Sequence, residues 1–106
     1  MDGTAYLIKE TFSKDSIGQP IAAETSTEIY VHEGSVNRSE FYEAGQHGLS
    51  ADLLLYTAAV NYSGEKLIRY NGEPYGIYRT YRDPDSDEIE LYLERKAGYD
   101  TSESQS

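Results

Sequence analysis

Cysteine and tryptophan are both absent from this chain of 106 residues, and methionine occurs once. Without cysteine the protein can form neither a disulfide framework nor a thiolate metal site, and it has no thiol nucleophile. The first five residues lack the basic stretch of a signal peptide. The longest nearly apolar run, residues 53–60, is far shorter than the roughly 20 residues that span a bilayer. We therefore expect a protein that is neither exported by a signal peptide nor embedded in a membrane.

Basic residues are scarce, because nine lysines and arginines face 19 acidic residues and leave a formal charge of -10. Such a field repels polyanions, which argues against phosphate backbones or anionic lipids as primary ligands. The acidic excess lies in residues 1–34 and 83–106, whereas the middle of the chain is balanced. An excess of this kind more often favours solubility than it marks a functional surface.

Tyrosine is abundant, with 11 copies beside only two phenylalanines. Its ring offers apolar area and its hydroxyl can stay wet, which suits half-buried strands and contact surfaces alike. The length fits one compact domain. Two-residue alternation between turn signals predicts about six strands. They are expected at residues 4–12, 21–34, 51–62, 66–70, 73–82 and 88–96.

The strand segments differ in their patterns. In 4–12 the alternation puts Tyr6, Ile8 and Phe12 on one face and Leu7, Lys9 and Thr11 on the other. Segment 21–34 is long enough to carry a bulge, which we expect at residues 22–23. Segment 51–62 is too apolar to be exposed on either face, so it is a central strand or a buried helix, and its Tyr, Thr and Val content favours the strand.

The end of the chain has clearer local signals. Asn71-Gly72 predicts a tight hairpin, because both residues accept the positive φ of a type I′ turn. Segment 88–96 alternates Ile89, Leu91 and Leu93, which we expect to face the core.

One helix is expected, over residues 38–46. Asn37 is a good N-cap and Glu40 follows three residues later, a pair that resembles a capping box. Either Gly45 or Gly48 ends the helix. Short hairpin loops, about six strands and one helix predict a mostly β fold: a small closed or partly open antiparallel β-barrel over residues 1–97. Residues 98–106 are polar and acidic, and we expect them to form a disordered tail.

Candidate chemical sites are weak. Asp83, Asp85, Asp87 and Glu94 imitate the spacing of a calcium loop, but Glu88 stands where such a loop needs glycine. Neither of the two histidines, His32 and His47, has a second histidine at ligand spacing, so surface positions are expected. Carboxylate pairs for glycoside hydrolysis stay open in so acidic a chain, yet a barrel of this size leaves little material for a cleft. We expect no enzyme, no cofactor and no metal.

An aromatic and basic mixture occurs in the second half of the chain. Its members are Arg38, Arg69, Arg79, Arg82, Tyr70, Tyr75, Tyr78 and Tyr81. The mixture could stack single-stranded bases on a sheet, or it could anchor a protein interface. The negative net charge favours the protein interface.

Four segments together are similar to one protein family. They read VNRSEFYEAGQ at 36–46, NYSGEK at 61–66, YGIYRTY at 75–81 and EIELYL at 88–93. In this order they resemble the head-closure proteins of tailed bacteriophages and prophages, also called stopper or head-tail joining proteins. The resemblance implies a β-barrel subunit that forms a ring below the portal and adaptor rings, closes the DNA channel after packaging and presents the docking surface for the tail.

Partners and location follow from the same resemblance. The partners would be copies of the chain in a ring, portal or adaptor proteins, tail proteins, and packaged DNA without sequence-specific binding. The protein would occur in the host cytoplasm during assembly and then in the virion. Contacts are expected from residues 13–20 and 33–50. The candidate interface residues are Ile17, Arg38, Phe41, Tyr42, Arg79 and Tyr81. Alternatives are an adaptor or tail-terminator subunit, an acidic DNA-mimic inhibitor, or a small oligonucleotide-binding barrel.

Overall fold

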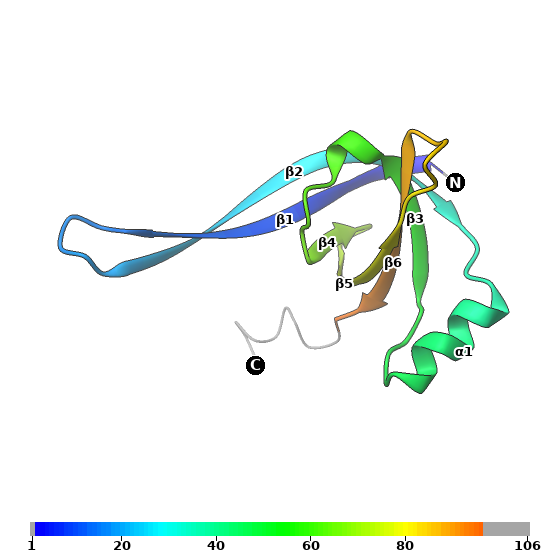
Figure 1. Ribbon diagram of the computed structural model, residues 1–106. Helices are drawn as coiled ribbons and strands as arrows, with labels where there is room; N and C mark the ends of the chain where they lie inside the picture. The colour runs from blue at the N-terminus through cyan, green and yellow to red at the C-terminus, as the bar shows by residue number, and fades with distance from the viewer. Residues whose placement is uncertain (1, 97–106) are drawn as a thin grey trace.

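Six antiparallel strands close into a barrel in the order β1-β2-β3-β6-β5-β4 (Figure 1). The computed structural model describes residues 2–96, so the acidic tail expected at 98–106 lies outside the described residues. The strands are β1 (Asp2–Lys14), β2 (Pro20–Gly34), β3 (Leu53–Ala58), β4 (Leu67–Tyr70), β5 (Glu73–Tyr81) and β6 (Glu88–Arg95). Helix α1 (Arg38–Gln46) connects β2 to β3, and a 3-10 turn, η1 (Ala59–Asn61), follows β3. The predicted fold class is confirmed.

The core fills the interior of the barrel with one face of each strand. Leu7, Leu55, Ile68 and Leu93 are fully buried there, and Leu91 is 0% exposed. Burying one such side chain stabilises the fold by about 1.5–3 kcal/mol. The inward face predicted for β6 is therefore confirmed. Of the two faces predicted for β1, the one that carries Leu7 points into the core.

Strand β3 is central, because it pairs with β2 on one side and with β6 on the other. Leu54 and Leu55 point to opposite faces of the sheet, yet both are buried. The prediction of a strand covered on both faces is confirmed. The predicted segment, 51–62, was longer than the strand itself, because the chain turns into η1 after Ala58.

Local signals control two chain reversals. Asn71 and Gly72 have φ angles of 54° and 78°, as a type I′ turn between β4 and β5 requires. At the start of α1 the side chain of Asn37 accepts a hydrogen bond from the Glu40 N–H at 2.7 Å. At its end Gly48 has a φ of +74°, and the Leu49 N–H donates to the Ala44 carbonyl at 2.9 Å. Of the two glycines considered, Gly48 ends the helix.

The bulge lies in β5 rather than in β2. The register between β1 and β2 is unbroken across residues 22–23, so that part of the prediction is wrong. In β5 the register shifts between Ile77 and Arg79, which makes Tyr78 the extra residue opposite β6. A bulge redirects side chains locally. Here it lets the neighbouring residues Tyr78 and Arg79 both reach the same carboxylate of α1.

The β1–β2 hairpin is much longer than the barrel needs. Strand β1 pairs with β4 only over residues 5–8, and β2 pairs with β3 only over residues 32–34. Residues 9–25, called the arm from here on, therefore form a two-stranded ribbon with no further strand beside it in the described chain. The arm projects from the barrel (Figure 1) and contributes to a longest dimension of 50 Å. The contact loop predicted at 13–20 is shorter, because strands reach to Lys14 and restart at Pro20.

Candidate functional site

The end of the arm is apolar on both faces. Phe12 is 72% exposed and Ile17 is 76% exposed, and Ile21 is exposed as well. Ile21 pairs with Ser13, so these two side chains lie on the same face of the ribbon. Phe12 precedes Ser13 in the strand, so its side chain lies on the opposite face from Ile21. Ile17 occupies the turn between them, where the Asp15 carboxylate accepts N–H groups of Ile17 and Gln19 at 3.0 and 2.9 Å. We call Phe12, Ile17 and Ile21 the apolar tip.

The apolar tip has the features of a contact surface. An isolated two-stranded hairpin is only marginally stable in water, because each strand has one partner and little covered area. Clustered exposed apolar side chains are typical of contact surfaces. An arm of this kind would gain stability from a surface that covered it.

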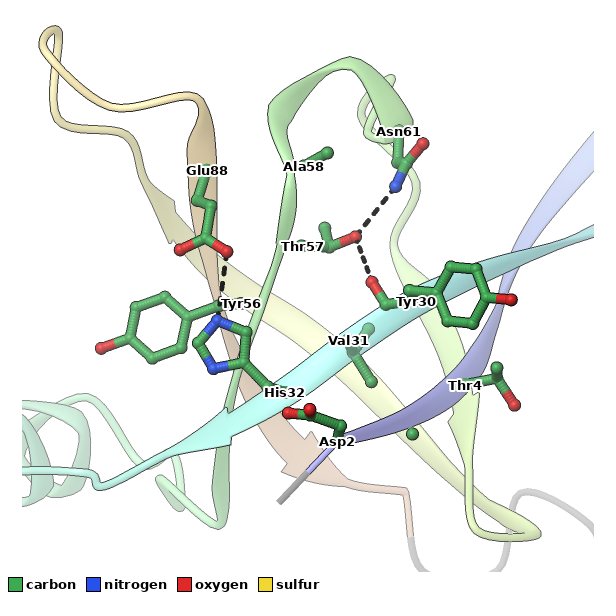
Figure 2. Close-up of a pocket in the computed structure, with 11 residues that line it drawn as sticks. Asp2, Thr4, Tyr30, Val31, His32, Tyr56, Thr57, Ala58, Asn61 and Glu88 are labelled. Carbon is green, nitrogen blue, oxygen red and sulfur yellow. Dashed lines mark hydrogen bonds and ion pairs between the residues drawn. The ribbon is translucent and has the colours of Figure 1, made fainter.

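A pocket of about 600 Å³ opens at the base of the arm, where β2 parts from β3. Pairing between these strands ends at His32 and Tyr56. Beyond that point the Thr57 hydroxyl donates to the Tyr30 carbonyl at 2.7 Å, and the Asn61 amide donates to the Thr57 hydroxyl at 3.0 Å (Figure 2). These bonds hold the two diverging strands at a fixed separation. We call this hollow the base pocket.

Aromatic rings and acids line the base pocket. In Figure 2 the ring of Tyr30 lies on one side, and the rings of His32 and Tyr56 lie on the other. His32 stacks on Tyr56 with ring centroids 4.8 Å apart, and its Nε2 lies 3.1 Å from a carboxylate oxygen of Glu88. Asp2 adds a second carboxylate to the lining. Aromatic walls beside carboxylates suit an apolar group that carries a positive charge next to it.

A second hollow, of about 520 Å³, lies along the first turns of α1. Arg38, Phe41 and Tyr42 line it together with Val36 and Ala51. The rings of Phe41 and Tyr42 meet edge to face at 6.2 Å, and both side chains are exposed. The structure thus brings half of the predicted interface residues together on one helix.

Arg79 is part of a clamp that ties α1 to β5. Its guanidinium donates to the Glu40 carboxylate and lies 4.1 Å from the centre of the Tyr92 ring. The Tyr78 hydroxyl donates to the same carboxylate at 2.7 Å. Glu40 is buried. Its side chain therefore does not complete the capping box that the sequence suggested, although its backbone N–H binds Asn37.

The clamp changes the ionisation of its members. The hydrogen bond from Arg79 lowers the pKa of the Glu40 carboxyl, although burial acts in the opposite direction. Burial and the hydrogen bond to Glu40 raise the pKa of Tyr78 well above its ordinary value. Burial and a hydrogen bond to Glu90 raise the pKa of Tyr92 to about 12. The clamp thus holds an ionised Glu40 against an always-charged arginine, which fixes the helix on the barrel.

The two remaining predicted interface residues lie on other elements than α1. Tyr81 is half exposed at the end of β5, and Ile17 belongs to the apolar tip. Sequence reasoning missed Phe12, Tyr30 and Tyr56 as surface groups. The one available signal was the length of the second strand segment, 21–34, which exceeds what a small barrel uses.

Two other sequence hypotheses have structural outcomes. Tyr70 and Tyr75 are buried in the core, so these two rings of the aromatic and basic mixture are not available to stack bases. Within residues 2–96 no group of three or more His, Asp or Glu side chains is placed to hold a metal ion. The acidic segment near Asp83 is a turn in which that carboxylate accepts the Asp85 N–H at 2.9 Å. None of the helices in the described part of the chain is long and apolar enough to cross a membrane.

Comparison with known proteins adds no relative, since neither the models of protein families nor the curated proteins contain a significant match to the chain.

Proposed function

We propose that the protein is a structural subunit of a phage head-tail connector. It closes the portal channel after DNA packaging and provides the docking surface for the tail. The observation that carries this proposal is the arm, whose apolar tip is covered by nothing in its own barrel. The sequence resemblance supports the same function. A barrel with a projecting arm and an exposed apolar tip suits a subunit that works by contact with copies of itself and with neighbouring rings.

The strand content favours head closure over the adaptor ring. Adaptor subunits of such connectors are expected to be largely helical, whereas this chain has six strands and a single α-helix within residues 2–96. The barrel supplies a stiff body, and the arm and the α1 hollow supply separate contact surfaces. A subunit between two other rings needs more than one such surface.

The charge suits a channel through which DNA passes. A formal charge of -10 disfavours tight binding to phosphates, so DNA can slide during ejection. The partners of this function are further copies in a ring, portal or adaptor proteins on the head side and tail proteins on the other. Assembly takes place in the host cytoplasm and the product is part of the virion.

The direct test is to delete the gene from its phage. Heads filled with DNA that leak, beside unattached tails, are the expected products in electron micrographs. Virions that mature normally without the chain, or a purified chain that turns over a substrate, would overturn the proposal.

An arm variant makes the same test sharper. Residues 10–24 are replaced by Asn-Gly, which joins Lys9 directly to its cross-strand partner Thr25 through a two-residue turn. We expect a folded barrel that fails to restore tail attachment in the deleted phage. The matched control is Val60→Asp, which alters a side chain that is 90% exposed outside the arm. The control should restore attachment.

A further inference from the structure

The apolar tip and the base pocket occur in one molecule but cannot meet there. The pair Thr4–Tyr30 borders the pocket and the pair Lys14–Pro20 closes the arm, ten residues farther along β1. At about 3.3 Å per residue the intervening ribbon keeps them about 33 Å apart. A tip can therefore enter only the pocket of another molecule.

The two surfaces are complementary in chemistry. The tip offers the exposed ring of Phe12. Lys14 lies on the same face of the ribbon, two residues nearer the end of the arm, whereas the carboxylates on that face, Glu10 and Glu24, lie two residues nearer the barrel. The base pocket offers the Tyr30 ring and the stacked pair of His32 and Tyr56, with carboxylates of Asp2 and Glu88 in its lining. An aromatic group with an ammonium beside it matches aromatic walls with carboxylates beside them.

We propose that the apolar tip of one copy of this chain seats in the base pocket of the next copy. Phe12 lies between Tyr30 and the His32–Tyr56 stack, and Lys14 faces Asp2 and Glu88. The tip and the pocket are different surfaces, so the contact is head-to-tail and every copy uses both halves. Such contacts close into a ring when the rotation between copies permits. The inference deepens the proposed function by naming how neighbouring subunits of the ring hold one another.

The occupant of the pocket is tested by sedimentation velocity of the full-length chain over a concentration series. The wild type should show concentration-dependent oligomers. Phe12→Asp should weaken self-association about 30-fold or more, the size expected for a central aromatic anchor. Val60→Asp introduces the same charge at an exposed apolar residue outside both surfaces, and it should leave self-association unchanged.

Mixing two variants tests the head-to-tail geometry. Phe12→Asp destroys the tip, and Ala58→Arg fills the pocket from an exposed position and repels Lys14. Each variant alone should be monomeric at concentrations where the wild type is oligomeric. Their mixture retains one intact tip and one intact pocket, so it should form heterodimers that grow no further. Restored long oligomers, or no association at all in the mixture, would overturn the geometry.

Cross-linking locates the tip directly, because the chain has no cysteine of its own. Lys14→Cys mixed with Glu88→Cys should give covalent dimers with a short bismaleimide. Lys14→Cys mixed with Arg38→Cys is the matched pair for the α1 hollow, and it should give far fewer. Preferential linkage to position 38 would place the tip on α1 and overturn the inference.

Failure of this inference differs from failure of the proposed function. A wild type that stays monomeric at every concentration, or oligomers that Phe12→Asp leaves intact, would end the tip-and-pocket contact. The connector function would still be decided by the phage deletion. Conversely, normal virions without the gene would end the connector function, while self-association lost in Phe12→Asp would still support the contact.

Discussion

Strands β1 and β2 run through both the barrel and the arm, yet their exposure to water differs between the two regions. Near its start β1 buries Ala5 and Leu7, whereas from Lys9 to Lys14 every residue is exposed. The difference comes from the neighbours, because β4 covers the open edge of β1 only over residues 5–8. Within the barrel the inward face of β1 is covered by the other strands, whereas in the arm both faces of β1 are exposed. Substitutions in the two regions should therefore differ in kind as well as in size.

The largest effect is expected in the barrel, from Leu91→Ala. This side chain is 0% exposed in the core, so its truncation removes buried area and leaves a cavity. The free energy of unfolding should fall by about 2–5 kcal/mol. Urea denaturation followed by circular dichroism measures it. A loss below about 1 kcal/mol would show that the interior of the barrel is not where the structure places it.

The next effect is expected at the clamp, from Glu40→Ala. The change leaves the Tyr78 hydroxyl and the Arg79 guanidinium without their acceptor, so the free energy of unfolding should fall by about 1–3 kcal/mol. Glu43→Ala on the same helix is the matched control, because that carboxylate is exposed and pairs only weakly with His47 in the described chain. It should change stability by about 0.5 kcal/mol or less. Equal losses in the two variants would contradict the clamp.

The free energy of unfolding at acidic pH tests the same clamp. The pKa of Glu40 is lower in the folded chain than its ordinary value of 4.5, because Arg79 donates a hydrogen bond to its carboxylate. Its contribution to stability is therefore complete above about pH 4.5 and is lost as the pH falls through the folded pKa. Glu40→Gln should flatten this part of the stability curve. An unchanged acid slope in that variant would assign the slope to other carboxyls.

Titration of the buried tyrosines at alkaline pH tests the packing of the barrel. Burial and a hydrogen bond to Glu33 raise the pKa of Tyr70 to about 12, and Tyr92 shifts to a similar value. Because these folded values exceed the ordinary value of 10, their contribution is complete below pH 10 and is lost as the pH rises toward 12. Tyrosinate absorbance should rise in two stages, and Tyr70→Phe should reduce the later one. A single stage complete before unfolding would contradict the burial of these hydroxyls.

The smallest effect on stability is expected from removing the arm. Replacing residues 10–24 by Asn-Gly deletes no residue of the hydrophobic core, so the free energy of unfolding should change by about 1 kcal/mol or less. Thermal and urea unfolding of the shortened and full-length chains give the comparison at concentrations where both are monomeric. A large loss would mean that the arm supports the barrel, and the contrast between the two regions would fail.

Local features were predictable because each depends on a few adjacent residues. The type I′ turn follows from Asn71-Gly72, and the start of α1 follows from Asn37. The inward face of β6 follows from simple alternation around Leu91. The sites were less predictable, since half of the expected interface residues gather on α1 while Arg79 is held by Glu40 of the same chain.

What the sequence determined by itself is thus the set of strands, their turns, the caps of one helix and the mostly β class. Only the tertiary structure decided that β4 closes the barrel against β1, that a bulge at Tyr78 completes the Glu40 clamp, and that Tyr70 belongs to the core. It also decided that the first hairpin outgrows its neighbours and becomes an arm. The physical reason is that turns and caps are settled by neighbouring residues, whereas exposure and pairing depend on which strand edges remain open once the barrel has closed.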